Sequence, residues 1–138
     1  MIEDTQDDII AQLETITAVK TVGAWQGDIE DLLKQPQKLP SLHVIYQGAS
    51  FETYEQAGDR PNLAMDWLIV LVGKSLKSRE AGAVSCYTII EAVRSALINH
   101  QVEEYDFLRP VKEDLILAEG GVLAYGLTYR MSNVLWEG

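Results

Sequence analysis

The fold is decided by one stretch of the chain, residues 41–72, which reads SLHVIYQGASFETYEQAGDRPNLAMDWLIVLV. Residues 41–46 have the composition of a β-strand, and residues 63–72 form a second, very apolar strand. Between them lie polar residues with two glycines and a proline. Hairpin connections usually hold about two to five residues, and longer ones are often functional. We therefore predict a β-hairpin whose extended arm, at about residues 47–62, contacts a partner.

Beyond Asp66, the second strand of this hairpin is apolar on both faces. Odd-numbered residues from 63 to 71 share one face, and even-numbered residues from 64 to 72 share the other. Such a strand lies in the centre of a sheet, or it buries its outer face against a partner. We expect Asp66 to lie at a strand end or in a salt bridge between subunits.

Periodicity and turn signals place the other elements. They are expected at residues 2–17 (helix), 19–25 (strand), 29–33 (short helix, with Asp28 as N-cap), 79–99 (long helix), and 105–111, 115–118 and 122–135 (extended segments). The long helix has an apolar stripe that includes Cys86, Tyr87 and Ile90. This order predicts one α+β domain over residues 1–138, with a mainly antiparallel sheet of four to five strands and two main helices packed on one face.

Charge and hydropathy exclude several classes of protein. The 138 residues carry a formal net charge of −10, which repels nucleic-acid phosphates, so we expect no nonspecific coating of DNA. This charge leaves open a channel through which DNA slides as passing cargo. The longest apolar run, residues 67–72, is far too short to span a bilayer, and we expect no membrane contact. A single cysteine, Cys86, rules out an internal disulfide, and the acidic N-terminus does not resemble a signal peptide. These features predict a soluble intracellular protein.

No motif in the chain carries recognisable catalytic chemistry. The two histidines, His43 in a strand and His100 at the end of the long helix, are expected to be structural or solvated. No paired-cysteine or H-E-x-x-H metal spacing occurs, and Gly23-x-x-x-Gly27 lacks the lysine of a phosphate-binding loop. The acids that open the first helix suit its dipole better than a metal ion. We predict no enzyme activity, no cofactor and no metal, and keep a small intracellular enzyme or regulatory binding module as an alternative.

Aromatic side chains near the arm are the better functional signal, because Trp and Tyr are enriched at interface hot spots. Trp67 is expected in the core, whereas two aromatic residues of the arm are expected at an interface. The candidate interface residues are Phe51, Glu52, Tyr54, Glu55, Arg60 and Asp66.

Several segments together carry a family resemblance. VKTV at 19–22, WQGD at 25–28, LPSLHV at 39–44 and YQGASF at 46–51, followed by WLIVLV at 67–72 and a long helix, resemble the Mu-like phage and prophage tail protein family. Proteins of this kind are similar to the tail terminators of long-tailed phages.

This resemblance implies a structural role in the virion tail. It implies a homo-oligomeric ring, commonly a hexamer, that is assembled in the bacterial host cytoplasm, caps the tail tube protein, and presents a surface to neck or connector proteins. The resemblance supplies no catalytic residues. Another neck or head–tail joining component is the alternative within the same particle.

Overall fold

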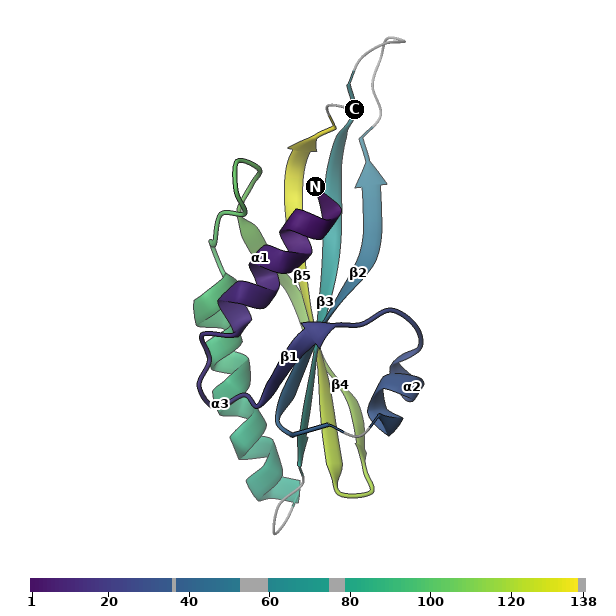
Figure 1. Ribbon diagram of the computed structural model, residues 1–138, viewed down its shortest axis with the longest axis vertical. Coiled ribbons are helices and arrows are strands. Elements are labelled where there is room, and N and C mark those ends of the chain that lie inside the picture. Colours follow the sequence, from purple (N-terminus) through teal and green to yellow (C-terminus); the bar gives the residue numbers. More distant parts are fainter. Residues whose placement is uncertain (36, 53–59, 75–78, 137–138) are drawn as a thin grey trace.

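The computed structural model describes residues 1–35, 37–52, 60–74 and 79–136, without the side chains of residues 79–82. The elements, in order, are α1 (Ile2–Leu13), β1 (Thr21–Ala24), α2 (Ile29–Lys34), β2 (Ser41–Phe51), β3 (Asn62–Lys74), α3 (Arg79–Leu97), β4 (Leu108–Glu119) and β5 (Val122–Leu135). The strands form one five-stranded sheet in the order β1-β2-β3-β5-β4 (Figure 1). The β1–β2 pair is parallel and the other three pairs are antiparallel, so the predicted α+β class and element order are confirmed.

The central position of β3 follows from its sequence. One face of β3, including the fully buried Trp67 and Ile69, joins the main core under α1 and α3. The other face, including Val70, packs with Leu32 of α2 in a second, smaller core. The two main helices therefore share one face of the sheet, and the short helix covers part of the other (Figure 1). Both layers shield β3 from water, which explains why it is apolar on both sides.

Both hairpin strands are longer than the sequence predicted. β2 continues past Tyr46 to Phe51, and β3 begins at Asn62, so residues 47–51 belong to the sheet rather than to a loop. The polar segment that follows Tyr46 lacks strand periodicity, but it pairs with β3 across a bulge at Gly48, whose φ is 121°. Only residues 52–61 connect the two strands, and residues 53–59 lie outside the described part of the chain. As a result, the paired hairpin projects beyond the start of α1 (Figure 1).

Other boundaries differ in smaller ways. α1 ends at Leu13 rather than at residue 17. The extended segments predicted at 105–111 and 115–118 form one strand, β4, and Pro110 lies on this edge strand, where a proline is tolerated. Tyr87 was predicted in the apolar stripe of α3, but it is 51% exposed and Ile89 is buried instead. The predicted turn at Gly120 and Gly121 is confirmed, with φ of 60° and 77°.

Candidate functional site

Three of the predicted interface residues lie together at the far end of the β2–β3 hairpin. Phe51 ends β2 opposite Leu63 and is 63% exposed. Glu52 and Arg60 follow on the two sides of the connection and are both exposed, and the N–H of Glu52 donates to the carbonyl of Asn62 at 2.9 Å. The predicted residues Tyr54 and Glu55 lie outside the described residues.

Asp66 does not belong to this group. It lies within β3 on the face opposite α1 and α3, and both of its carboxylate oxygens accept hydrogen bonds from Arg130 of β5. The expected strand-end position is therefore wrong. The carboxylate has a partner within its own subunit, because register places Arg130 directly opposite it.

Two further exposed apolar residues lie at the same end of the sheet as Phe51, on opposite faces of it. Leu135 lies opposite Asn62 in the register of β3 and β5, and the N–H of Trp136 donates to the carbonyl of Pro61 at 3.0 Å. Leu135 is 41% exposed and Trp136 is 47% exposed. Leu135 projects from the face opposite Phe51, so we call only Phe51 and Trp136 the hairpin-root patch. Trp136 directly follows the extended segment predicted at residues 122–135, but only the pairing of β5 with β3 shows that it lies near the hairpin.

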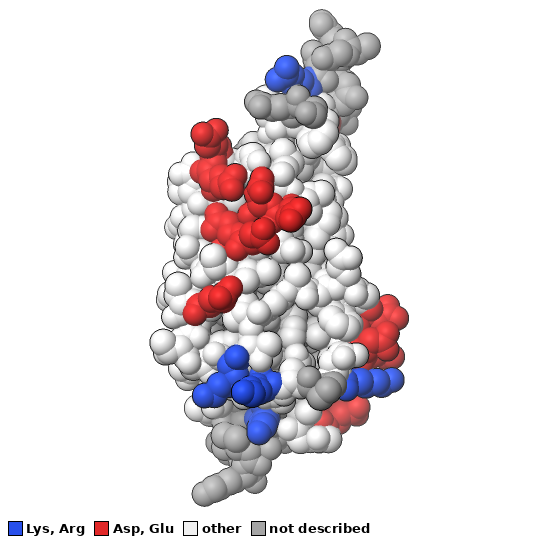
Figure 2. All heavy atoms as spheres, in the orientation of Figure 1, with Lys and Arg blue, Asp and Glu red and all other residues white. Residues whose placement is uncertain are grey.

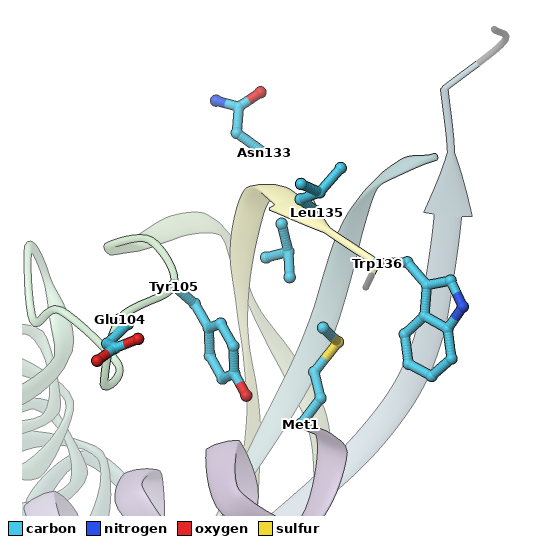
Figure 3. A pocket seen from close by; sticks show the side chains of 7 residues that line it. Met1, Glu104, Tyr105, Asn133, Leu135 and Trp136 are labelled. Carbon is cyan, nitrogen blue, oxygen red and sulfur yellow. The ribbon is translucent and has the colours of Figure 1, made fainter. Parts of the chain in front are cut away.

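A hollow of about 480 Å³ adjoins this patch between the start of α1, the loop before β4 and the end of β5. Figure 3 shows the side chains around it, which are Met1, Glu104, Tyr105, Asn133, Val134, Leu135 and Trp136. Asn133 has a positive φ of 55° and lies at the register shift between β5 and β3. The mixed polar and apolar lining contains no paired nucleophile and base. It suits a protruding side chain of a protein partner better than a reacting substrate.

A second apolar surface lies between α3 and β4. Val84, Tyr87 and Leu115 are each more than half exposed, and we call them the α3–β4 patch. The ring of Tyr87 meets that of Tyr125 edge-on, with centroids 6.4 Å apart. A hollow of about 310 Å³ lies here, and its lining includes Tyr87, Leu115 and Tyr125.

An ion pair closes one side of this second hollow. Nε of Arg94 on α3 donates to Oε2 of Glu113 on β4 at 2.9 Å, and a second bond joins Nη2 to Oε1. The hydrogen bond from Arg94, together with its charge, lowers the pKa of Glu113 despite partial burial. The pair links α3 to the edge strand β4.

Charges are unevenly distributed over the face that carries α1. Figure 2 shows a group of acidic side chains over the upper left of this face, lysine or arginine side chains near its lower end, a second acidic group at the lower right and a basic side chain near the top. Glu3, Asp4 and Asp7 of α1 are exposed, while Asp8 pairs with His100 at 2.9 Å. No group of three or more potential metal ligands occurs among the described residues, so a metal site at these acids gains no support.

The two histidines have structural surroundings. His43 is 5% exposed, and its Nε2 shares a hydrogen bond with Oγ of Ser41 at 2.8 Å. Burial lowers the pKa of His43 and so favours the neutral ring.

Within the described part of the chain, no helix has the length and hydropathy needed to cross a membrane.

Comparison with known proteins identifies the family. One solved structure with a similar fold is titled "Virion of native gene transfer agent (GTA) particle". It superposes with a TM-score of 0.62 at 14% sequence identity, over 95% of this chain and 94% of that one. No curated protein sequence matches this chain. The sequence model of the phage tail terminator proteins matches residues 4–136, which confirms the resemblance to tail terminators and leaves the Mu-like subdivision a prediction. The chain therefore belongs to the phage tail terminator family and is a structural protein of a phage-type virion.

Proposed function

We propose that this protein closes into a homo-oligomeric ring, a hexamer in the phage particle, on the end of the tail tube. In this proposal, the ring presents its other side to neck or connector proteins and permits head–tail joining. DNA passes through the ring as cargo. Assembly takes place in the cytoplasm of the bacterial host, and the subunit performs no catalysis.

The observation that carries this proposal is the presence of two different exposed apolar patches on one subunit. The hairpin-root patch lies at the projecting end of the sheet, and the α3–β4 patch lies on other elements. A cyclic ring needs two unlike surfaces, because each subunit contacts its neighbour head to tail. Exposed aromatic residues beside a hollow are typical of interface anchors and their receptor sites. In our proposal, Phe51 and Trp136 of one copy contact the Tyr87–Leu115 groove of the next.

The excess of negative charge suits a passage for DNA. A wall that attracted phosphates would gain free energy by releasing counterions and would hold the DNA. With a formal net charge of −10, the subunit has little such attraction to offer. This supports DNA as cargo rather than as a bound ligand.

Sedimentation of the purified protein tests the ring. We expect a ring-sized species at high protein concentration, alone or with tail tubes, and a shift to monomer in Phe51→Ser. Phe107→Ser is the matched control, because Phe107 is 40% exposed but lies outside both patches. A wild-type protein that stays monomeric even with tubes present contradicts the ring.

Electron microscopy of particles made without this protein tests the terminator role. Overlong tails without heads are expected if the ring stops tube growth. Tails of normal length without heads would instead favour a neck or head–tail joining component.

A further inference from the structure

One edge of the sheet is open where β2 extends past β1. β1 pairs only with Ser41–Val44, and the last contact is the N–H of Trp25 donating to the carbonyl of Val44 at 3.0 Å. From residue 45 to residue 51, the described part of the chain offers β2 a strand partner only in β3. Figure 1 shows no element along the outer side of this upper half of β2.

Strand alternation identifies the backbone groups on this edge. The carbonyl of Val44 points outward to β1. The backbone N–H and C=O groups of Tyr46, two residues later, therefore also point outward. The bulge at Gly48 inserts one residue and shifts the alternation. The N–H of Glu52 donates to β3, which agrees with the shifted pattern. The residues whose N–H and C=O groups point away from β3 are therefore Tyr46, Ala49 and Phe51.

The opposite edge of the sheet is protected against strand addition. The backbone of Leu108 on β4 forms two hydrogen bonds with the preceding chain: its N–H donates to the carbonyl of His100, and its carbonyl accepts from the N–H of Asn99. The backbone N–H and C=O groups of Leu108 therefore point away from β5. Pro110, two residues later, also holds an outward position, where it offers no N–H. Two register shifts and the charged run Lys112–Asp114 further disfavour pairing.

The open edge of β2 lacks most of these devices. Residues 45–51, IYQGASF, include no charged residue and no proline. The single bulge at Gly48 is the only irregularity in the pairing of this segment. Proteins usually protect a solvent-exposed sheet edge against pairing with other strands. Because the β4 edge is protected and the β2 edge is not, we infer that a partner covers the β2 edge.

The chemistry of this edge specifies an extended segment as the partner. Outward N–H and C=O groups at alternate positions bind another strand, and Tyr46, Ala49 and Phe51 place apolar side chains on the helix-bearing face beside it. A second copy is a poor donor, because its β4 edge is protected. Antiparallel pairing of β2 with β2 of a second copy has two-fold symmetry, so it joins only two copies and cannot continue around a ring.

We propose that the outer edge of β2, residues 45–51, binds an extended segment of a different tail protein by β-strand addition. The segment has apolar residues at alternate positions facing the helix-bearing side. The assignment of the partner to the tail rests on the proposed function. The geometry of strand addition is independent of that function.

Amide hydrogen exchange tests the site directly, with tails isolated from a phage that lacks this protein as the probe. Binding to these tails is expected to slow exchange of the amides of Tyr46 and Ala49 at least tenfold. Equal protection of these amides in the protein alone, at ring-forming concentration, would overturn the choice of partner. Binding to tails without protection at residues 45–51 would overturn the site.

A proline substitution tests the same edge by binding. Ala49→Pro removes one outward N–H without removing a bond to β3, and Ala49→Ser, which keeps the N–H, is the matched control. We expect Ala49→Pro to bind the tails at least tenfold more weakly while its sedimentation in the absence of tails matches that of wild type. A folded Ala49→Pro protein that binds as wild type does would overturn the proposal; if it does not fold, the exchange experiment decides. A wild-type protein that forms no ring but shows the protection would contradict the proposed ring and leave the strand-addition site standing.

Discussion

Arg130 of β5 holds Asp66 of β3 through two hydrogen bonds, from Nε to Oδ1 at 2.7 Å and from Nη2 to Oδ2 at 3.1 Å. The residues are direct register partners on the face opposite α1 and α3. The pairing satisfies the carboxylate within one chain and removes the need for a charge from a neighbouring subunit. It is also compatible with the register that the buried residues on both faces of β3 specify.

We predict that Asp66→Asn lowers the free energy of unfolding by about 0.2–1 kcal/mol, because the pair is partly exposed and directly cross-strand. Urea denaturation of Asp66→Asn, Arg130→Gln and the double variant measures the coupling. Ring formation is expected to remain unchanged. A variant with wild-type stability but no ring would mean that Asp66 contacts a neighbouring subunit after all.

The two tryptophans Trp67 and Trp136 are predicted to separate stability from assembly. Trp67 is fully buried, with its ring centroid 5.1 Å from that of Tyr46, so Trp67→Ala is expected to cost about 3–5 kcal/mol. Trp136 is 47% exposed, so Trp136→Ala is expected to change stability by less than about 1 kcal/mol but to weaken assembly. Thermal unfolding and sedimentation of both variants check this contrast. Unimpaired assembly of Trp136→Ala would exclude Trp136 from the interface.

The elements with strong hydrophobic periodicity were predictable from the sequence. β5 has its predicted bounds, and the two-faced pattern of β3 correctly indicates a central strand. The second half of β2 was not predictable, because a polar run with a glycine gives no alternation. It becomes a strand only through pairing with β3.

The candidate site was predictable only in part, for a related reason. Phe51 was found because it follows a strand and is aromatic. Its neighbour Trp136 is 85 positions away in sequence, and no local pattern reports that β5 ends beside the hairpin. Tyr87 shows the opposite error: its spacing fits the apolar stripe, yet it lies at the margin of that stripe, where the sheet does not cover it.

Close packing of Gly73 against Cys86 provides a third prediction. A Cβ atom at Gly73 would lie 2.7 Å from Sγ of Cys86, so Gly73→Ala is expected to cost about 1–3 kcal/mol. Adding Cys86→Ala removes the clash, and the double variant is expected to be more stable than the sum of the single effects. Gly23→Ala is the control, because no heavy atom lies within 4 Å of its added Cβ. Additive costs in denaturant unfolding would contradict the contact.

The ion pair between Arg94 and Glu113 provides a fourth prediction. Arg94 lowers the pKa of Glu113, so the pair stabilises the fold above the usual glutamate pKa and loses this effect as the pH falls through the lowered value. Arg94→Met is expected to raise the pKa of Glu113, measured from its carboxyl carbon by NMR. The stability difference from wild type is expected to be largest near neutral pH and to vanish in acid. Lys112→Met is the control, because its exposed pair with Asp114 is separate from Glu113; an unchanged Glu113 pKa in Arg94→Met would contradict the pair.

Tyr129 provides the fifth prediction, at alkaline pH. This residue of β5 is 1% exposed, and burial raises the pKa of its hydroxyl to about 12. The unfolded chain has the usual tyrosine pKa near 10, so it loses this proton first as the pH rises. The stabilising effect is therefore complete below pH 10 and is lost between about pH 10 and 12, at a cost of about 2–3 kcal/mol.

Tyr129→Phe removes this titration, because phenylalanine has no proton to lose. The variant is expected to have a flatter dependence of unfolding free energy on pH between about pH 10 and 12 than the wild type, whose other tyrosines titrate in both proteins. Urea denaturation at a series of pH values measures the difference, and Tyr54→Phe serves as a control for removing one tyrosine hydroxyl from the hairpin connection. Parallel pH profiles for wild type and Tyr129→Phe would mean that water reaches the hydroxyl and that this part of the core is less closed than its burial indicates.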